Sequence, residues 1–197
     1  MRKSIYNISP IDGRYTNLTE DLKKYFSEAA LIKYRVYIEI EYFINLCNIN
    51  LPELQGVSKK KLKDVAKIAS EISEKDILEI KKIEKVTNHD VKAVEYFIKK
   101  KFKKLNLSQY QEFIHFGLTS QDINNTASPI LLMDALNLSF YPELSKLIKK
   151  LYELSSKWKN ISMLARTHGQ PASPTKLGKE IKVFKVRLEE QLNQLKK

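Results

Sequence analysis

The sequence predicts an all-α protein. Apolar residues recur every three or four positions along most of the chain, and no segment alternates convincingly with a period of two. Five Gly and six Pro are too few for a turn-dense all-β fold. Apolar residues make up 43% of the 197 residues, which is enough to bury a core. We therefore expect helices joined by short loops.

The first quarter of the chain predicts an irregular arm followed by a long helix. Residues 1–17 have no periodicity, and Ser9–Gly13 contains two dipeptides typical of turns. From Thr19 to Cys47 an apolar stripe predicts a helix with one packed face. Pro and Gly break this pattern within residues 48–57.

Shorter helices are expected next. Weaker helical patterns cover residues 58–72 and 74–86, and Ser73 with Asp76 resembles a capping box. Thr87–Asp90 is a second box-like start and predicts another helix. A short segment is expected from Ser108 to Phe116, ended by Gly117.

The second half predicts two longer helices. Thr119 with Asp122 opens a pattern that runs to Trp158, which Pro129 and Pro142 should bend or divide.

A link and a last helix follow. Residues 160–174 are expected to be a non-periodic link. Ser173-Pro174 is expected to cap an amphipathic helix over 176–197. That pattern is still complete at Leu195, so we expect the chain to be part of a longer protein.

Composition excludes several classes. A single cysteine, Cys47, excludes an internal disulfide framework and a Cys-clustered zinc site. The longest charge-free stretches, Tyr42–Pro52 and Ile123–Met133, are eleven residues and too short to span a bilayer. No apolar secretory segment follows Arg2 and Lys3. We expect a cytoplasmic protein without a membrane partner.

The net charge of +12 comes mostly from lysine, since 30 of the 35 basic residues are Lys. Proteins that bind nucleic acids use arginine guanidinium groups interleaved with aromatic side chains, and the lysine runs of this sequence lack this combination. The favoured interpretation is therefore that the lysines lie on solvent-exposed helix faces. A basic helical binding module, motivated by Lys99–Lys104, is the alternative.

The three histidines differ in their surroundings, and no His-x-x-x-His spacing typical of a metal site is present. His115, among apolar residues, is expected to be packed and hydrogen bonded. His89 at a helix start is equally compatible with capping and with function. His168 lies beside Gly169 and near Arg166, which favours a role in proton transfer.

Two further sites could bind anions. Thr119 and Ser120 combine hydroxyls with the free amides of a helix first turn. Arg14 and Tyr15 follow a turn, which suits a phosphate or a base edge, although a surface turn is the simpler interpretation of that segment alone.

Four segments together resemble the adenylosuccinate lyases of the bacterial kind, within the fumarase/aspartase superfamily. They occur in that family's order: Ser9–Tyr15, Thr87–Phe97, Glu112–Asn125 and Arg166–Pro174. The resemblance implies a β-elimination that releases fumarate from adenylosuccinate to give AMP, and a parallel reaction on succinylaminoimidazole carboxamide ribotide. It implies no metal or cofactor.

The resemblance also implies residue roles. His168 is expected to be the general acid toward the leaving nitrogen. The substrate-binding residues are expected to be Arg14, Tyr15, Asn88, His89, Asp90, Thr119 and Ser120. His89 is expected near the phosphate, and Thr119 and Ser120 near the succinyl part.

The resemblance covers part of the family's pattern. Residues 1–111 match its N-terminal helical domain, and residues 112–197 match the beginning of its central helical bundle. The loop that carries the family's serine base does not occur in this sequence. The family forms homotetramers whose active sites draw on three subunits, so we expect this chain alone to be inactive and to associate with copies of itself.

Overall fold

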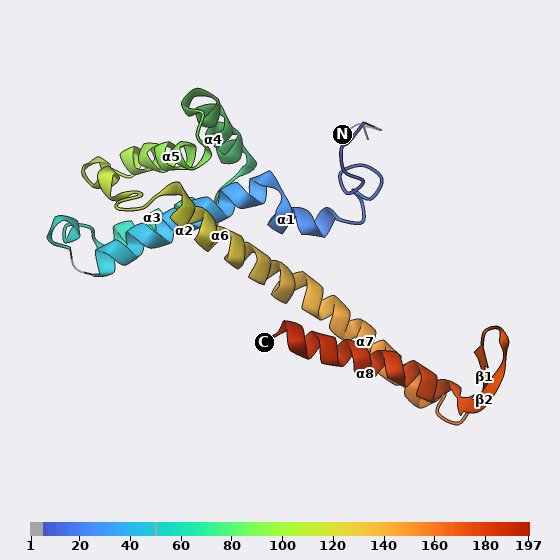
Figure 1. Ribbon diagram of the computed structural model, residues 1–197. Coiled ribbons are helices and arrows are strands. Elements are labelled where there is room, and N and C mark those ends of the chain that lie inside the picture. The colour runs from blue at the N-terminus through green and yellow to red at the C-terminus, as the bar shows by residue number, and fades with distance from the viewer. Residues whose placement is uncertain (1–5, 50) are drawn as a thin grey trace. The chain divides into compact units, whose positions relative to one another are not determined.

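The computed structural model describes residues 6–49 and 51–197 and is mostly helical, as the sequence predicts (Figure 1). The chain forms two compact units, Met1–Ala135 and Leu136–Lys197. The domain boundary expected between residues 111 and 112 concerns the family's domains and stays a prediction.

The first unit is a helical assembly with its own core. Its elements are α1 (Lys23–Phe26), α2 (Glu28–Asn48), α3 (Lys59–Ser70), α4 (Glu74–Thr87), α5 (Asp90–Lys104) and α6 (Ser120–Ala135), with 3-10 turns at Glu20–Leu22, Pro52–Leu54 and Ser108–Phe113. The α2 stripe predicted from the sequence packs against α5. Phe43 and Phe102 meet edge to face, with ring centroids 4.8 Å apart, and both are fully buried.

The N-terminal arm and the predicted long helix need one correction. Residues 6–17 form turns without a regular helix, as expected, while residues 1–5 lie outside the described residues. The expected helix from Thr19 is interrupted at Ser27, which is extended (ψ 161°) and accepts a hydrogen bond from the Ala30 amide at 3.1 Å. Ser27 therefore acts as the N-cap of α2, because its hydroxyl satisfies a first-turn amide.

One predicted capping box forms and the other does not. Ser73 and Asp76 make the reciprocal bonds of a capping box at the start of α4. Thr87, in contrast, is the last residue of α4, and Asn88 adopts a left-handed conformation (φ 51°). His89 caps α5 instead, accepting from the Lys92 amide at Nδ1 (3.2 Å). Asn tolerates the left-handed region, so the chain turns there before α5 begins.

The α4 box gives a pH-dependent prediction. Burial works to raise the pKa of the Asp76 carboxyl, but hydrogen bonds from Lys101 and Ser73 outweigh it and hold the pKa at about 2. The ionised form therefore stabilises the fold above the normal carboxyl pKa, and this stability is lost as pH falls toward 2. We expect Asp76→Asn to lower the free energy of unfolding by about 1–2 kcal/mol at pH 7 and by almost nothing at pH 2.

Urea unfolding of both proteins at pH 7, 4 and 2 measures this difference. Asp64→Asn is the matched control, because Asp64 makes a looser pair with Lys67 (3.6 Å). A loss that is the same at every pH would contradict the assigned role of the Asp76 charge.

The second unit contains a π-helical turn (Leu136–Phe140), α7 (Tyr141–Lys157), β1 (Ser162–Thr167), β2 (Gln170–Lys176) and α8 (Leu177–Leu195). The long pattern from Thr119 is divided as expected, but only at the second proline. Pro129 lies inside α6, whereas Pro142 lies in the first turn of α7, directly after the π-helical turn. Pro142 has no backbone donor, so the regular ladder cannot run through it.

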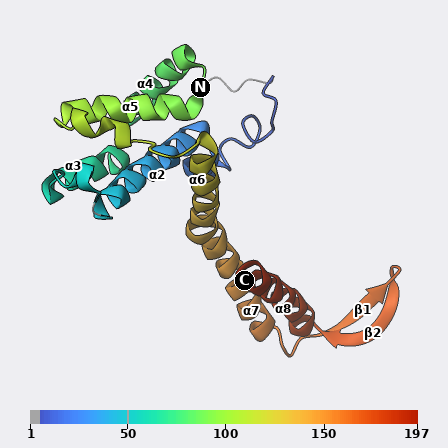
Figure 2. The ribbon, with the colours of Figure 1, turned by 60° about the vertical axis from the view of Figure 1, so that its left-hand side comes forward.

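The link expected over residues 160–174 is instead an antiparallel hairpin (Figure 2). His168 and Gly169 form its two-residue turn with φ of 51° and 78°, the two positive values that a type I′ turn requires. Ser173-Pro174 belongs to β2 and caps nothing. The helix α8 starts at Leu177 after Lys176, which makes no side-chain capping bond.

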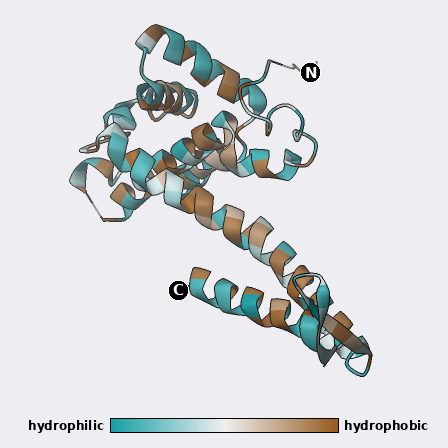
Figure 3. Ribbon diagram, turned by 45° about the vertical axis from the view of Figure 1, so that its right-hand side comes forward, coloured by the Kyte–Doolittle hydropathy of each residue, from teal (hydrophilic) through white to brown (hydrophobic). Residues whose placement is uncertain are grey.

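The helices α7 and α8 approach closely at a glycine. The Gly178 amide donates to the Trp158 carbonyl at 3.1 Å, and a Cβ at Gly178 would lie 2.2 Å from the Ser155 carbonyl oxygen. Bands of hydrophobic and hydrophilic residues follow one another along both helices (Figure 3). Large side chains on them are exposed, among them Leu147 (49%) and Phe184 (57%).

Candidate active site

Two buried charged side chains organise the first unit around its candidate site residues. Arg35 and Glu39 lie one turn apart on α2, and their side chains are 9% and 0% exposed. Charged side chains are buried only when they are paired or hydrogen bonded. Arg35 contacts Asp90 and Asn124, and Glu39 contacts His115, all of which lie in segments that resemble the lyase family.

Arg35 joins two of these segments. One Nη lies 2.7 Å from Asp90 Oδ2, and Nε donates to Asn124 Oδ1 at 2.9 Å. Burial works to raise the pKa of the Asp90 carboxyl, but the Val91 amide and Arg35 outweigh it and hold the pKa low. Asp90 is therefore a carboxylate fixed at the start of α5.

Glu39 contacts His115. His115 Nδ1 lies 2.6 Å from Glu39 Oε1, and His115 is held in a left-handed backbone conformation (φ 60°). The expectation that His115 is packed and hydrogen bonded is confirmed. Burial raises the pKa of Glu39, against the opposing hydrogen bond with His115. Among the described residues, Glu39 Oε2 is buried without a hydrogen-bond partner.

The turn before α5 borders an open pocket of about 530 Å³, which is lined by Lys81, Glu84, Lys85, Asn88, His89 and Asp90. Because His89 Nδ1 accepts the Lys92 amide, the neutral ring carries its proton on Nε2. His89 is half exposed and so presents a donor at Nε2. Lys81 is already bound to Glu28 (2.6 Å) and Glu84 (2.7 Å). The pocket thus combines the His89 donor and the Lys85 ammonium, which suit an anionic group, with the carboxylates of Glu84 and Asp90.

The start of α6 already holds a carboxylate of its own. Asp122 Oδ2 accepts from the Thr119 amide (2.7 Å) and hydroxyl (3.0 Å), and these bonds lower the pKa of Asp122. Both Thr119 donors therefore face Asp122, and a ligand would have to displace that side chain to use them. Ser120 is the first residue of α6, one turn before Asn124.

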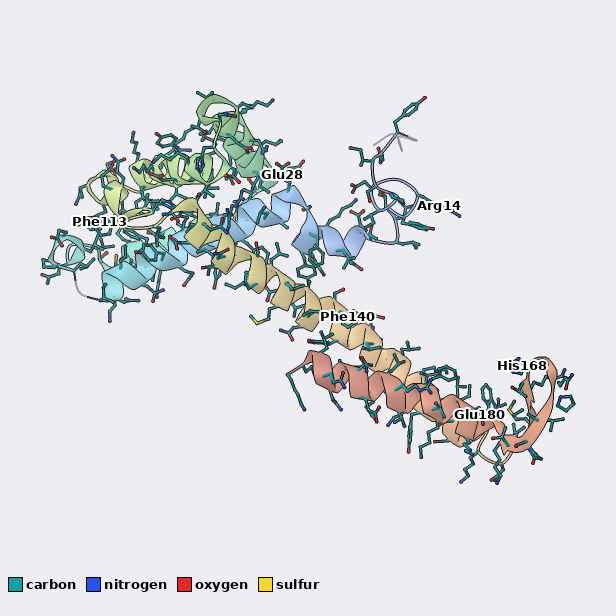
Figure 4. The ribbon with its side chains drawn as sticks, in the orientation of Figure 1. Arg14, Glu28, Phe113, Phe140, His168 and Glu180 are labelled. Atoms are coloured by element: carbon teal, nitrogen blue, oxygen red, sulfur yellow. The ribbon has the colours of Figure 1, made fainter. Side chains whose placement is uncertain are left out.

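The remaining candidates lie elsewhere in the chain. Arg14 and Tyr15 belong to the N-terminal arm, where the guanidinium lies 5.5 Å from the Tyr15 ring centroid. His168 belongs to the second unit and is exposed at the hairpin tip, as labelled in Figure 4. The structure thus brings together Asp90 and the α6 segment through Arg35.

Sequence reasoning missed Arg35 and Glu39. Both flank the buried stripe positions Val36 and Ile40, spaced by one helical turn. Oppositely charged residues four positions apart beside a buried stripe were the signal that could have identified them. Among residues 6–49 and 51–197, no group of three or more His, Cys, Asp or Glu is placed to hold a metal ion, and no helix is long and apolar enough to cross a membrane.

The fold is a helical one, and a comparison with protein families shows the class to which the chain belongs. A model of the family described as "Lyase" matches residues 13–197, so the chain belongs to this lyase family. Two solved structures share the fold at 19% identity. They are β-carboxy-cis,cis-muconate cycloisomerase of Acinetobacter calcoaceticus sp. ADP1, with a TM-score of 0.68 over 90% of this chain and 40% of that chain, and 3-carboxy-cis,cis-muconate lactonizing enzyme of Pseudomonas putida, with a TM-score of 0.64 over 90% and 39%.

Curated proteins that are similar in sequence point to one kind of lyase. The chain is 53% identical over 196 residues to adenylosuccinate lyase of Dictyostelium discoideum, covering 95% of this chain and 41% of that protein. It is 42% identical over 190 residues to adenylosuccinate lyase of Vibrio cholerae serotype O1, covering 95% and 42%. The resemblance inferred from the four segments is confirmed. The chain spans about two fifths of the length of these relatives.

Proposed function

We propose that this chain is the N-terminal part of an enzyme that eliminates fumarate from adenylosuccinate to give AMP, and from succinylaminoimidazole carboxamide ribotide in the same way. The observation that carries the proposal is the 53% identity to an adenylosuccinate lyase over 95% of the chain. In this reaction a base takes the proton from the succinyl Cβ. The C–N bond then breaks, and an acid protonates the leaving nitrogen.

The residues of this chain take the following roles in the proposal. His168 is the acid, since a placed imidazole can donate a proton near neutral pH. Arg14, Tyr15 and Asn88 hold the nucleotide, and His89 directs its Nε2–H to an anionic group of the substrate. Asp90 fixes the turn that carries His89. Thr119 and Ser120 contact the succinyl part once Asp122 yields its place.

The decisive experiment uses the product of this chain's gene, including any coding sequence that follows Lys197. Fumarate formation from adenylosuccinate is measured by absorbance. Turnover of adenylosuccinate supports the proposal, and a complete, folded product without turnover overturns it.

The 197-residue chain alone is expected to release no fumarate, because the serine base of the family lies in a loop that this sequence does not contain. The assay is the same, with the purified chain at high concentration and host enzyme excluded by a mock purification. Turnover by the chain alone would show that the base lies within these residues.

The chain is also expected to self-associate, as the proposed homotetramer requires, in the cytoplasm and without a nucleic-acid or membrane partner. Exposed apolar side chains on α7 and α8, such as Leu147 and Phe184, suit an interface between copies. Sedimentation velocity should show oligomers, and Leu147→Glu with Phe184→Glu should reduce them. A monomer at all concentrations would contradict this expectation.

The alternative of a basic binding module finds less support. Lys99 pairs with Glu95 and Glu112, Lys100 with Glu79 and Lys101 with Asp76. These contacts pair three of the five lysines in the cluster that motivated the alternative, and the pairs of Lys100 and Lys101 join α5 to α4.

A further inference from the structure

Arg35 contacts two candidate motifs that are far apart in the sequence. Its Nη holds Asp90, which follows His89 at the start of α5, and its Nε holds Asn124, one turn after Ser120 in α6. The α2 helix that carries Arg35 is anchored in the core by Val36 and Ile40, both fully buried. Arg35 is therefore held in place by the core and contacts both segments, whose relative position would otherwise depend on the loops that connect them.

The chemistry of the guanidinium explains why arginine suits this position. Its donors lie in one rigid plane, so two partners on different edges are held at a set distance and angle to each other. A lysine ammonium is a point charge and can keep the Asp90 pair, but it has no second donor locked in the direction of Asn124. Since the side chain is 9% exposed, water cannot readily replace a lost partner.

We propose that Arg35 is a positioning residue that sets the placement of the His89-Asp90 turn relative to the start of α6 by holding Asp90 and Asn124 at the same time. The proposal rests on the proposed function only in treating these two segments as parts of one substrate site. Its physical content is a coupling: a change at Asn124 reaches His89 through Arg35.

The reporter is the imidazole of His89. In the wild-type chain its proton lies on Nε2, because Nδ1 accepts the Lys92 amide. Asp90 Oδ1 lies 3.7 Å from the same Nδ1. When Arg35 no longer holds Asp90, the carboxylate can turn to Nδ1 and draw the proton there. Nitrogen-15 NMR distinguishes these two tautomers.

The experiment compares the 197-residue chain with Asn124→Ala, Arg35→Met and the double variant. Asn124→Ala should shift the His89 nitrogen signals, and Arg35→Met should move the ring toward the Nδ1–H tautomer. In the Arg35→Met background, Asn124→Ala should add no further shift. Lys101→Met is the control, since it removes another ion pair of α5, with Asp76 at 2.6 Å, and should leave the His89 signals unchanged.

Arg35→Lys keeps the test decisive if Arg35→Met does not fold. It should retain the Nε2–H tautomer, because the charge still faces Asp90, and should make the His89 signals insensitive to Asn124→Ala. The proposal is overturned if Asn124→Ala shifts His89 equally in the wild-type and Arg35→Lys backgrounds, or if Arg35→Met folds and leaves His89 unchanged. No substrate is used, so a gene product that fails to release fumarate would refute the proposed function without touching this result.

Discussion

Replacing His168 by Gln in the complete enzyme to which we assign this chain is expected to lower kcat by about 10² or more with a much smaller change in KM. Under the proposed roles, the variant loses the proton donor to the leaving nitrogen and keeps Arg14, Tyr15 and Asn88 as the nucleotide contacts. Steady-state kinetics with adenylosuccinate measures both constants.

The position of His168 in the hairpin dictates the control. Its φ of 51° lies in the left-handed region, which Asn adopts more readily than most residues. His168→Asn should therefore keep the turn and still remove the proposed acid, so it should lose as much kcat as His168→Gln. Because the side chain is exposed, both variants should keep the free energy of unfolding within about 0.5 kcal/mol. Full activity in His168→Asn would show that the turn matters and the imidazole does not.

Replacing His115 by Ala is expected to act on stability, lowering the free energy of unfolding by about 3 kcal/mol. The substitution removes the hydrogen-bond partner of Glu39, whose side chain is fully buried and whose second oxygen already has no partner among the described residues. Calorimetry should show a fall in Tm of roughly 10 °C.

The pair can be separated by a double-mutant cycle. Glu39→Gln removes the buried charge while keeping a group of the same shape, so His115→Ala should cost less in that background. Because burial raises the pKa of Glu39, its contribution favours folding at low pH and is lost as pH rises through the raised pKa. Glu39→Gln should therefore gain stability relative to wild type as pH rises from about 4.

If His115→Ala abolishes turnover and His168→Gln changes only the melting temperature, the roles assigned to His115 and His168 are reversed.

Local patterns were sufficient for most helices of this protein. Apolar side chains spaced at three or four residues lie on one face of a helix, and that face packs into the core. The stripe through Val36 and Ile40 therefore predicted both α2 and its buried face. The Ser73–Asp76 box was equally local, because both partners lie within one turn. The family resemblance was also contained in the sequence, since it depends on residue order alone.

Only the tertiary structure decided the hairpin and the contacts of the site. The strands around His168 are mostly exposed and lack an alternating burial pattern, so no hydrophobic face with a period of two predicts their pairing. Arg35 and Glu39 gain their roles from Asn124 and His115, partners 89 and 76 residues away. A buried charged side chain is stable only where polar partners contact it. The sequence spacing of Asn124 and His115 does not show that they contact Arg35 and Glu39.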